Sequence, residues 1–162
     1  MNPLRIPVAE ILGRPGATRP VSGDFALPGL ALDQTGSAAV GDITVELEIS
    51  AIVEGLAVSG RVAGAWAAEC RRCLDDVGGD IEVAVNEIFE DEATEAETWP
   101  IEAEHIDLEP LVREAVLLAL PLSPLCGPQC AGPDPDRFPT TGREADRPEK
   151  DPRWAALDDL EL

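Results

Sequence analysis

The sequence predicts an α+β domain in which an antiparallel β-sheet, forming a meander or partial barrel, is packed by one main helix. Three runs within residues 42–86 alternate apolar and polar residues, the pattern of strands that bury one face. One amphipathic segment, residues 107–120, follows them with the spacing of a helix. The four cysteines form two close pairs, one between the second and third runs and one directly after the helical segment. The pairs indicate that the end of the helix and the sheet come together.

The residues before the first alternating run predict little regular structure. Residues 4–12 are apolar but short, and they fit either a strand or a turn of helix. Arg14-Pro15-Gly16 interrupts the chain, and glycine, proline and small residues are frequent up to residue 41. We therefore expect an irregular N-terminal arm over residues 13–41, within a single domain that spans residues 1–132.

The alternating runs define the sheet, and they cover residues 43–49, 56–70 and 81–85. Gly60 and Gly64 in the second run predict a bent strand, or one that another backbone approaches closely. An antiparallel meander is the simplest arrangement of three such strands. It places Cys70 and Cys73 in the connection between the second and third strands.

The helical segment has clear start and stop signals. Asp107 can cap it, and Pro110 lies in the first turn, where a missing N–H is harmless. Pro121 ends it. Its apolar face is formed by Leu108, Leu111, Val112, Ala115, Val116 and Ala119. Such a face needs a partner, and the apolar face of the sheet is the obvious one.

Residues 133–162 predict a proline-rich, charged and disordered tail, because they offer little apolar surface to bury. A short apolar set near the end interrupts this pattern and fits a terminal helix that docks on the domain or on a partner. It consists of Trp154, Ala155, Leu157 and Leu160.

The net charge of −20, from 12 basic and 32 acidic residues, bears on the partners of the chain. Such a chain repels nucleic acid unless basic residues cluster locally, and the candidates for a nucleic-acid-contacting patch are Arg61, Arg71 and Arg72. Residues 87–104 are acidic without one lysine or arginine. The favoured interpretation of this stretch is a solvated linker. The alternative is a docking surface for a basic protein, formed by Glu90, Asp91, Glu92, Glu95 and Glu97.

No stretch resembles a membrane span or a secretory signal, so we expect a cytoplasmic, reducing location. There, paired cysteines are more often metal ligands or redox groups than disulfides. Cys70, Cys73, Cys126 and Cys130 supply the ligands of a tetrahedral zinc site. Two alternatives remain: reduced, metal-free thiols, and a thioredoxin-like redox pair, which lacks the expected βαβ setting.

The sequence does not favour an enzyme. His105 is the only histidine, and it lies between acidic neighbours, as a surface or capping residue does. The many carboxylates are too diffuse to nominate an acid–base pair. We expect neither a catalytic residue nor a small-molecule substrate.

Several motifs in order resemble the YceD family of large-ribosomal-RNA-subunit accumulation proteins. They are a meander ending in Cys-Arg-Arg-Cys-Leu, an acidic segment, an Asp-Leu-Glu-Pro helix start, Leu-Pro-Leu-Ser-Pro-Leu-Cys-x3-Cys, and Asp151-Pro152-Arg153-Trp154-Ala155-Ala156-Leu157. By position, Cys70 and Cys73 match the first family motif, and Cys126 and Cys130 match the start of the second. The second motif then departs, because the chain lacks the later cysteines that family members often carry.

The resemblance implies a bacterial cytoplasmic protein that supports synthesis, processing or stability of the 23S rRNA. We therefore expect a non-enzymatic factor in large-subunit biogenesis, with large-subunit rRNA or its precursor particle as partner. The acidic charge suggests a finer hypothesis, in which the protein escorts a basic ribosomal protein. The rival hypothesis is a small zinc- or thiol-based regulatory module without a ribosomal role.

Overall fold

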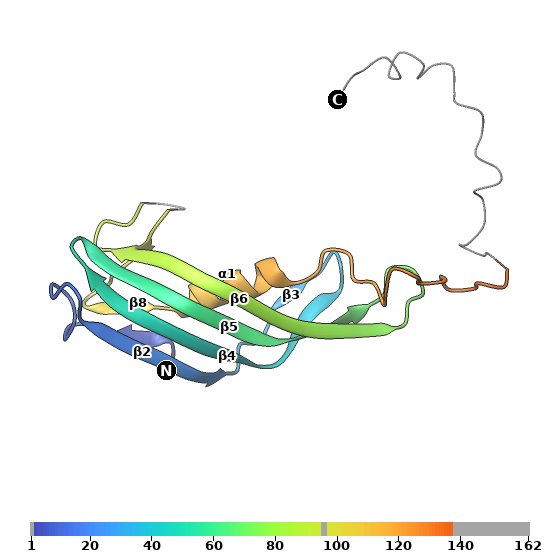
Figure 1. Cartoon of the computed structure of the whole chain (residues 1–162), viewed down its shortest axis with the longest axis horizontal. Coiled ribbons are helices and arrows are strands. Elements are labelled where there is room, and N and C mark those ends of the chain that lie inside the picture. The colour runs from blue at the N-terminus through green and yellow to red at the C-terminus, as the bar shows by residue number, and fades with distance from the viewer. Residues whose placement is uncertain (1, 95–96, 138–162) are drawn as a thin grey trace, which may run out of the picture.

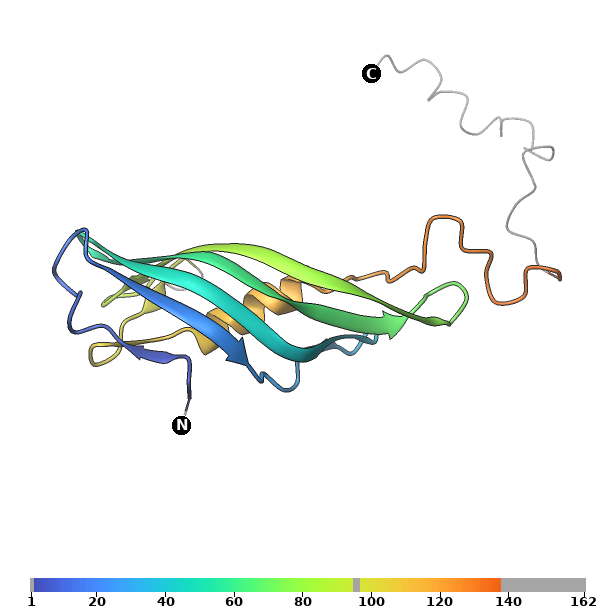
Figure 2. The ribbon, with the colours of Figure 1, turned by 60° about the horizontal axis from the view of Figure 1, so that its bottom comes forward.

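A computed structural model describes residues 2–94 and 97–137, and it confirms the α+β class (Figure 1). The strands are β1 (Arg5–Pro7), β2 (Thr18–Phe25), β3 (Ala31–Leu32), β4 (Ser37–Ile52), β5 (Gly55–Glu69), β6 (Asp76–Glu90), β7 (Trp99–Pro100) and β8 (His105–Asp107), and the helix is α1 (Glu109–Ala119). The main sheet has the order β2-β4-β5-β6-β7, with β3 also paired to β4. The sheet is long and twisted, and α1 lies along one of its faces (Figure 2).

The predicted meander is formed by β4, β5 and β6, which pair antiparallel with short connections. β4 and β6 are longer than the alternating runs that predicted them, whereas β5 has the length of its run. β4 begins at Ser37 because a register shift between Val40 and Thr44 lets an earlier segment join the sheet. β6 continues to Glu90, so it takes in the beginning of the acidic stretch.

Gly60 is one position where the second strand needs glycine. Its φ is +146°, and a Cβ placed there would lie 2.2 Å from the Glu46 carbonyl oxygen on β4. A side chain at this position would therefore clash with a backbone that the sheet holds in place. The predicted close approach of another backbone is confirmed at this residue.

The core lies between α1 and the inner face of the sheet. Leu111, Val112 and Val116 of the helix are buried against the inward residues of the meander. The N-cap residue is Leu108, not the predicted Asp107, and it makes no side-chain cap bond. The Oδ1 atom of Asp107 instead accepts a hydrogen bond from the Glu109 amide at 2.9 Å, just before the first turn. At the other end the helix ends at Ala119, before Pro121.

A small second sheet ties the N-terminus to the start of the helix. β1 pairs antiparallel with β8, and the Asn2 side chain donates hydrogen bonds to the Asp107 carboxylate at 2.9 and 3.0 Å. The apolar residues at 4–12 thereby form a short strand and a buried extension of the core.

The expected irregular arm is wrong for residues 18–25. This segment forms β2, which pairs with β4 over its whole length. Burial alternates along β2, but its inward positions carry Arg19 and Gly23 as well as Val21 and Phe25, so the sequence lacks the apolar alternation that predicts a strand. Edge strands tolerate such a sequence, Pro20 included, because one side of their backbone needs no partner.

The linker interpretation of residues 87–104 is also wrong in part. Residues 87–90 belong to β6, and β7 pairs with β6 in parallel. The Trp99 ring stacks on Phe89 at 6.2 Å between ring centroids, and Ile101 is buried. The stretch is therefore anchored to the sheet at both ends. The expected disordered tail and terminal helix lie almost entirely in residues 138–162, outside the described residues, and 133–137 contain no helix or strand.

Candidate metal centre

The four cysteines come together at one end of the sheet, where the β5–β6 hairpin meets the chain leaving α1. Cys70 and Cys73 lie in the hairpin turn, and Cys126 and Cys130 lie in the segment after the helix. The Cys70 and Cys130 sulfurs are 3.8 Å apart, and those of Cys73 and Cys126 are 3.7 Å apart. All four Sγ atoms lie within 4.8 Å of one another.

Main-chain hydrogen bonds hold the two cysteine segments against each other. The Arg71 amide donates to the Pro124 carbonyl at 2.9 Å, and the Arg71 guanidinium donates to the Leu122 carbonyl at 3.3 Å. The Cys126 amide points at the Cys70 sulfur at 3.4 Å. The hairpin turn is closed by a bond from the Leu74 amide to the Cys70 carbonyl at 2.9 Å. The thiols are thus positioned by backbone rather than by side-chain packing alone.

The thiol arrangement fits a tetrahedral ion. With metal–sulfur bonds of about 2.3 Å, a tetrahedron of four sulfurs has edges of about 3.8 Å. The two printed sulfur–sulfur distances, 3.7 and 3.8 Å, match that edge. They are much longer than the roughly 2.05 Å of a disulfide bond, and all four cysteines are free thiols.

The pKa values of the thiols diverge because the groups share one small space. Backbone N–H groups, first that of Cys73 and then those of Arg72 and Cys126, lower the pKa of Cys70 to about 6. For Cys73, the Asp75 N–H lowers the pKa, but burial and the other three thiols together raise it to about 12. The pKa of Cys126 is raised, first by the Cys130 thiol. One thiolate therefore forms easily, and a second is disfavoured unless a cation shares the site.

The three candidate rRNA-contacting arginines do not form one patch. Arg61 lies in the middle of β5, where it pairs with Glu46 at 2.6 Å and Glu82 at 3.8 Å. Arg71 and Arg72 lie in the hairpin turn, ten positions further along, which corresponds to roughly 30 Å of extended strand. The partners of Arg61 further reduce its availability to a phosphate.

The acidic docking residues are brought near one another only in part. Glu90 ends β6, and Asp91, Glu92 and Glu97 lie in the exposed connection to β7. Glu95 lies outside the described residues. Two further carboxylates that sequence reasoning did not nominate lie in one groove with Glu97, apart from Glu90, Asp91 and Glu92: Glu87 on β6 and Glu114 on α1.

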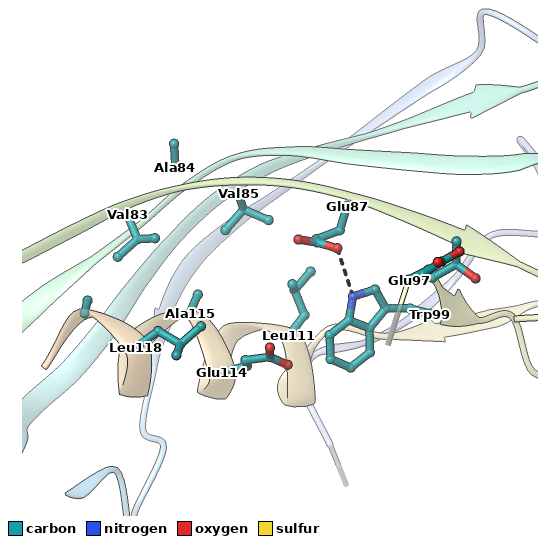
Figure 3. Close-up of a pocket in the computed structure, with 12 residues that line it drawn as sticks. Val83, Ala84, Val85, Glu87, Glu97, Trp99, Leu111, Glu114, Ala115 and Leu118 are labelled. Carbon is teal, nitrogen blue, oxygen red and sulfur yellow. Dashed lines mark hydrogen bonds between the residues drawn. The ribbon is translucent and has the colours of Figure 1, made fainter. Parts of the chain in front are cut away.

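These additional acids line a groove of about 670 Å³ between β6 and α1 (Figure 3). One end is acidic, with Glu87, Glu97 and Glu114 placed around Trp99, whose indole N–H donates to Glu87 at 3.3 Å. The other end is apolar and includes Val83 and Leu118. The signal available in the sequence was Leu118, an apolar residue outside the predicted apolar face of the helix, whose side chain is 79% exposed.

Comparisons with known proteins place the chain among bacterial relatives. The family model described as "Large ribosomal RNA subunit accumulation protein YceD" matches residues 58–161. Uncharacterized proteins of Mycobacterium tuberculosis and Mycobacterium bovis are each 36% identical over 168 residues, covering 96% of this chain and 80% of theirs. An uncharacterized protein of Mycobacterium leprae is 32% identical over 127 residues, covering 73% of this chain and 58% of its own. No solved structure matches the chain.

Within the described residues, no helix has the length and apolar character needed to cross a membrane.

Proposed function

This chain belongs to the YceD family, and from that premise we propose that it is a non-enzymatic, cytoplasmic factor in large-subunit ribosome biogenesis. In this role it would support the synthesis, processing or stability of the 23S rRNA. The observation that carries the proposal is the family match, which spans 58–161 and so includes both cysteine pairs.

The proposal includes a structural zinc ion held by Cys70, Cys73, Cys126 and Cys130. Its support is the cluster of four thiols, in which two sulfur–sulfur distances are 3.7 and 3.8 Å and two of the four cysteines are buried. Zinc bound there would hold the chain after α1 against the β5–β6 hairpin. Protein purified without chelator should contain about one zinc per chain by elemental analysis. Folded, fully reduced protein without metal would contradict this part of the proposal.

The proposed mode of action is the escort of a basic ribosomal protein. Its support is the charge of −20 together with the exposed carboxylates of Asp91 and Glu92 and the groove carboxylates of Glu87, Glu97 and Glu114. A dense negative surface speeds the encounter with a basic partner and lowers non-specific contact of that partner with RNA. Direct binding to bare rRNA has weaker support, because Arg61 is paired with carboxylates and lies far from Arg71 and Arg72.

Co-sedimentation of the native protein with large-subunit precursor particles tests the ribosomal role. We expect association with the precursors and little with mature subunits. Complete absence from precursor fractions would favour the rival class, a zinc- or thiol-based module without a ribosomal role, which has the cysteine cluster as its only support.

Neutralising the acidic surface tests the escort. Glu90, Asp91, Glu92, Glu95 and Glu97 are replaced by glutamine or asparagine. We expect weaker capture of a basic ribosomal protein, and an affinity for RNA that is equal or higher, because repulsion has been removed. The escort is wrong if this variant keeps every ribosomal-protein interaction while Arg71→Ala with Arg72→Ala abolishes binding to rRNA.

A further inference from the structure

Strand β6 has an open edge over most of its length. On one side it pairs with β5 continuously from Asp76 to Phe89, without a shift in register. On the other side, the described chain pairs with it only at Phe89 and Glu90, through β7. Such an edge offers unpaired main-chain donors and acceptors to another extended segment.

The direction of the open backbone groups follows from one hydrogen bond. The Ile101 amide donates to the Glu90 carbonyl at 2.9 Å. The backbone groups of Glu90 therefore point away from β5, toward the side of β6 that is open over the rest of the strand. Backbone groups alternate between the two sides of a strand, and the register here is unbroken. The N–H and C=O groups of Ala84 and Asn86 therefore face the same open side, where no described strand meets them.

The groove between β6 and α1 lies beside this edge and combines two chemical features. At one end, Val83, Ala115 and the exposed Leu118 form an apolar floor. At the other end, the carboxylates of Glu87, Glu97 and Glu114 gather near Trp99 (Figure 3). No lysine or arginine is among the described residues that line the groove.

We propose that this groove binds an extended basic segment of a partner protein, which adds to the open edge of β6 as a further strand. Main-chain bonds to Ala84 and Asn86 would supply affinity, and side chains entering the groove would supply specificity. Val83 and Glu87 are four positions apart, which is about 13 Å along a strand. A segment of about five residues therefore fits, with an aliphatic side chain at one end and a lysine or arginine four positions away.

Charge selects a partner protein over the other occupants of such an edge. A second copy of this chain would bring another net charge of −20 and another set of carboxylates against the same acidic end. The chain's own residues 138–162 carry seven acidic and four basic side chains, so they are also net negative. A basic segment gains attraction from three carboxylates at once.

This inference rests on the proposed function in one respect, because it takes the escorted protein to be the source of the basic segment. It adds the binding mode and two residues, Glu87 and Glu114, which lie outside the acidic set nominated from the sequence. The site can nevertheless be tested with peptides, independently of any ribosomal protein.

The test titrates the full-length, isotope-labelled protein with capped seven-residue peptides followed by NMR. The peptides carry leucine and arginine four positions apart, in both orders, with threonine and lysine elsewhere. We expect saturable shifts at the amides of Ala84 and Asn86 and slower hydrogen exchange at both when one of these peptides is bound. Two N-methylated forms of the same peptide are compared, one methylated at its odd-numbered residues and one at its even-numbered residues, so that each lacks the N–H donors along one edge. The form that lacks the donors facing β6 should lose binding, and the other should keep it.

A matched pair of variants tests the acidic end. Glu87→Gln, Glu97→Gln and Glu114→Gln together should weaken binding about tenfold at low salt, because three exposed charge pairs are lost. Glutamine keeps an acceptor for the Trp99 indole, so the fold should be retained. The control, Glu10→Gln with Glu48→Gln and Glu69→Gln, makes the same change in net charge at exposed positions outside the groove and should bind as the native protein does.

Three results would overturn the inference. One is equal binding of the parent peptide and of both N-methylated forms, which excludes strand addition. Another is equal affinity of the two glutamine variants. The third is slow exchange of the Ala84 and Asn86 amides in the protein without peptide, which would mean that its own tail or a second copy already covers the edge. If peptides bind as expected but the protein is absent from precursor particles, the proposed function fails while the binding site stands.

Discussion

Replacing Cys126 by alanine should open one end of the molecule locally while the core stays closed. Cys126 is exposed, so the substitution removes a metal ligand with little loss of packing. Cys70 and Cys130 are buried, yet neither belongs to the hydrophobic cluster that joins α1 to the sheet. Regions with few core contacts open independently of the global transition. The stability of the cysteine end should therefore depend on the proposed zinc ion.

The size of the effect follows from linkage between metal binding and opening. Free zinc held at a thousand times its dissociation constant raises the free energy of opening by about 4.1 kcal/mol, which is a thousandfold change in hydrogen exchange. That change should appear at the Arg71 amide, which bonds to Pro124 across the two cysteine segments, and at the Cys130 amide. The Val112 amide bonds to the Leu108 carbonyl inside the core, so its hydrogen exchange should have the same rate with and without zinc.

The assay is hydrogen exchange by NMR on native protein and on Cys126→Ala, each in a zinc buffer and after chelation. Gln129→Ala is the control, because Gln129 is an exposed residue of the same segment without a thiol. The reasoning is refuted if the Arg71 amide of the native protein exchanges equally fast with and without zinc. It is also refuted if Val112 accelerates by the same factor as Arg71, since the metal would then stabilise the whole domain rather than one end.

Three further substitutions test how the scaffold holds the site. Gly60→Ala should lower the free energy of unfolding by about 3 kcal/mol or prevent folding, measured by urea denaturation, because its Cβ would overlap the Glu46 carbonyl. Ser37→Ala should lower it by about 1–2 kcal/mol in the same assay, because the buried Ser37 hydroxyl donates to the Pro121 carbonyl at 2.8 Å. Leu74→Gly should raise the thermal midpoint of the zinc-free protein or leave it unchanged, because Leu74 has a φ of +66° and is 65% exposed.

Controls and contrary outcomes differ for these substitutions. Gly127→Ala is the partner of Gly60→Ala, since a Cβ there meets nothing within 4 Å, and it should be close to neutral. Equal stability of the two alanine variants would contradict the close approach at Gly60. A neutral Ser37→Ala would show that its hydrogen bond adds nothing to the junction between β4 and the end of α1. A clear loss of stability in Leu74→Gly would mean that the leucine side chain contributes more than its positive φ costs.

The α+β class and the meander could be predicted because each strand of the meander buries one face. Ile43, Val45, Leu47 and Ile49 are all buried, and the residues between them are not. The helix was predicted at 107–120 and observed at Glu109–Ala119, since proline and aspartate mark its ends directly in the sequence. β2 could not be predicted, because its inward side combines Val21 and Phe25 with Arg19 and Gly23, and main-chain pairing with β4 holds much of it in place.

The cysteine cluster could be predicted from spacing, but its closure depends on tertiary structure. The two pairs meet because the β5–β6 turn and the exit from α1 lie at the same end of the sheet, which no local pattern reveals. The candidate arginines are not brought together for the converse reason, since Arg61 and Arg71 are ten positions apart along β5 and the turn after it. The groove was not predicted because Glu114 and Leu118 on α1 line it together with residues of β6, and the sequence does not reveal that α1 lies beside β6.

The pairing of β1 with β8 imposes an order on folding during synthesis. Residues 5–7 find their partners only at 105–107, so the N-terminal strand has nothing to pair with until most of the domain has left the ribosome. The hairpins of β4, β5 and β6 need only neighbouring residues and can form earlier. The cysteine cluster comes last, because it requires Cys130. A nascent chain therefore completes its four-cysteine cluster after its sheet, and a chain whose translation stalls before residue 126 holds only the two thiols of Cys70 and Cys73.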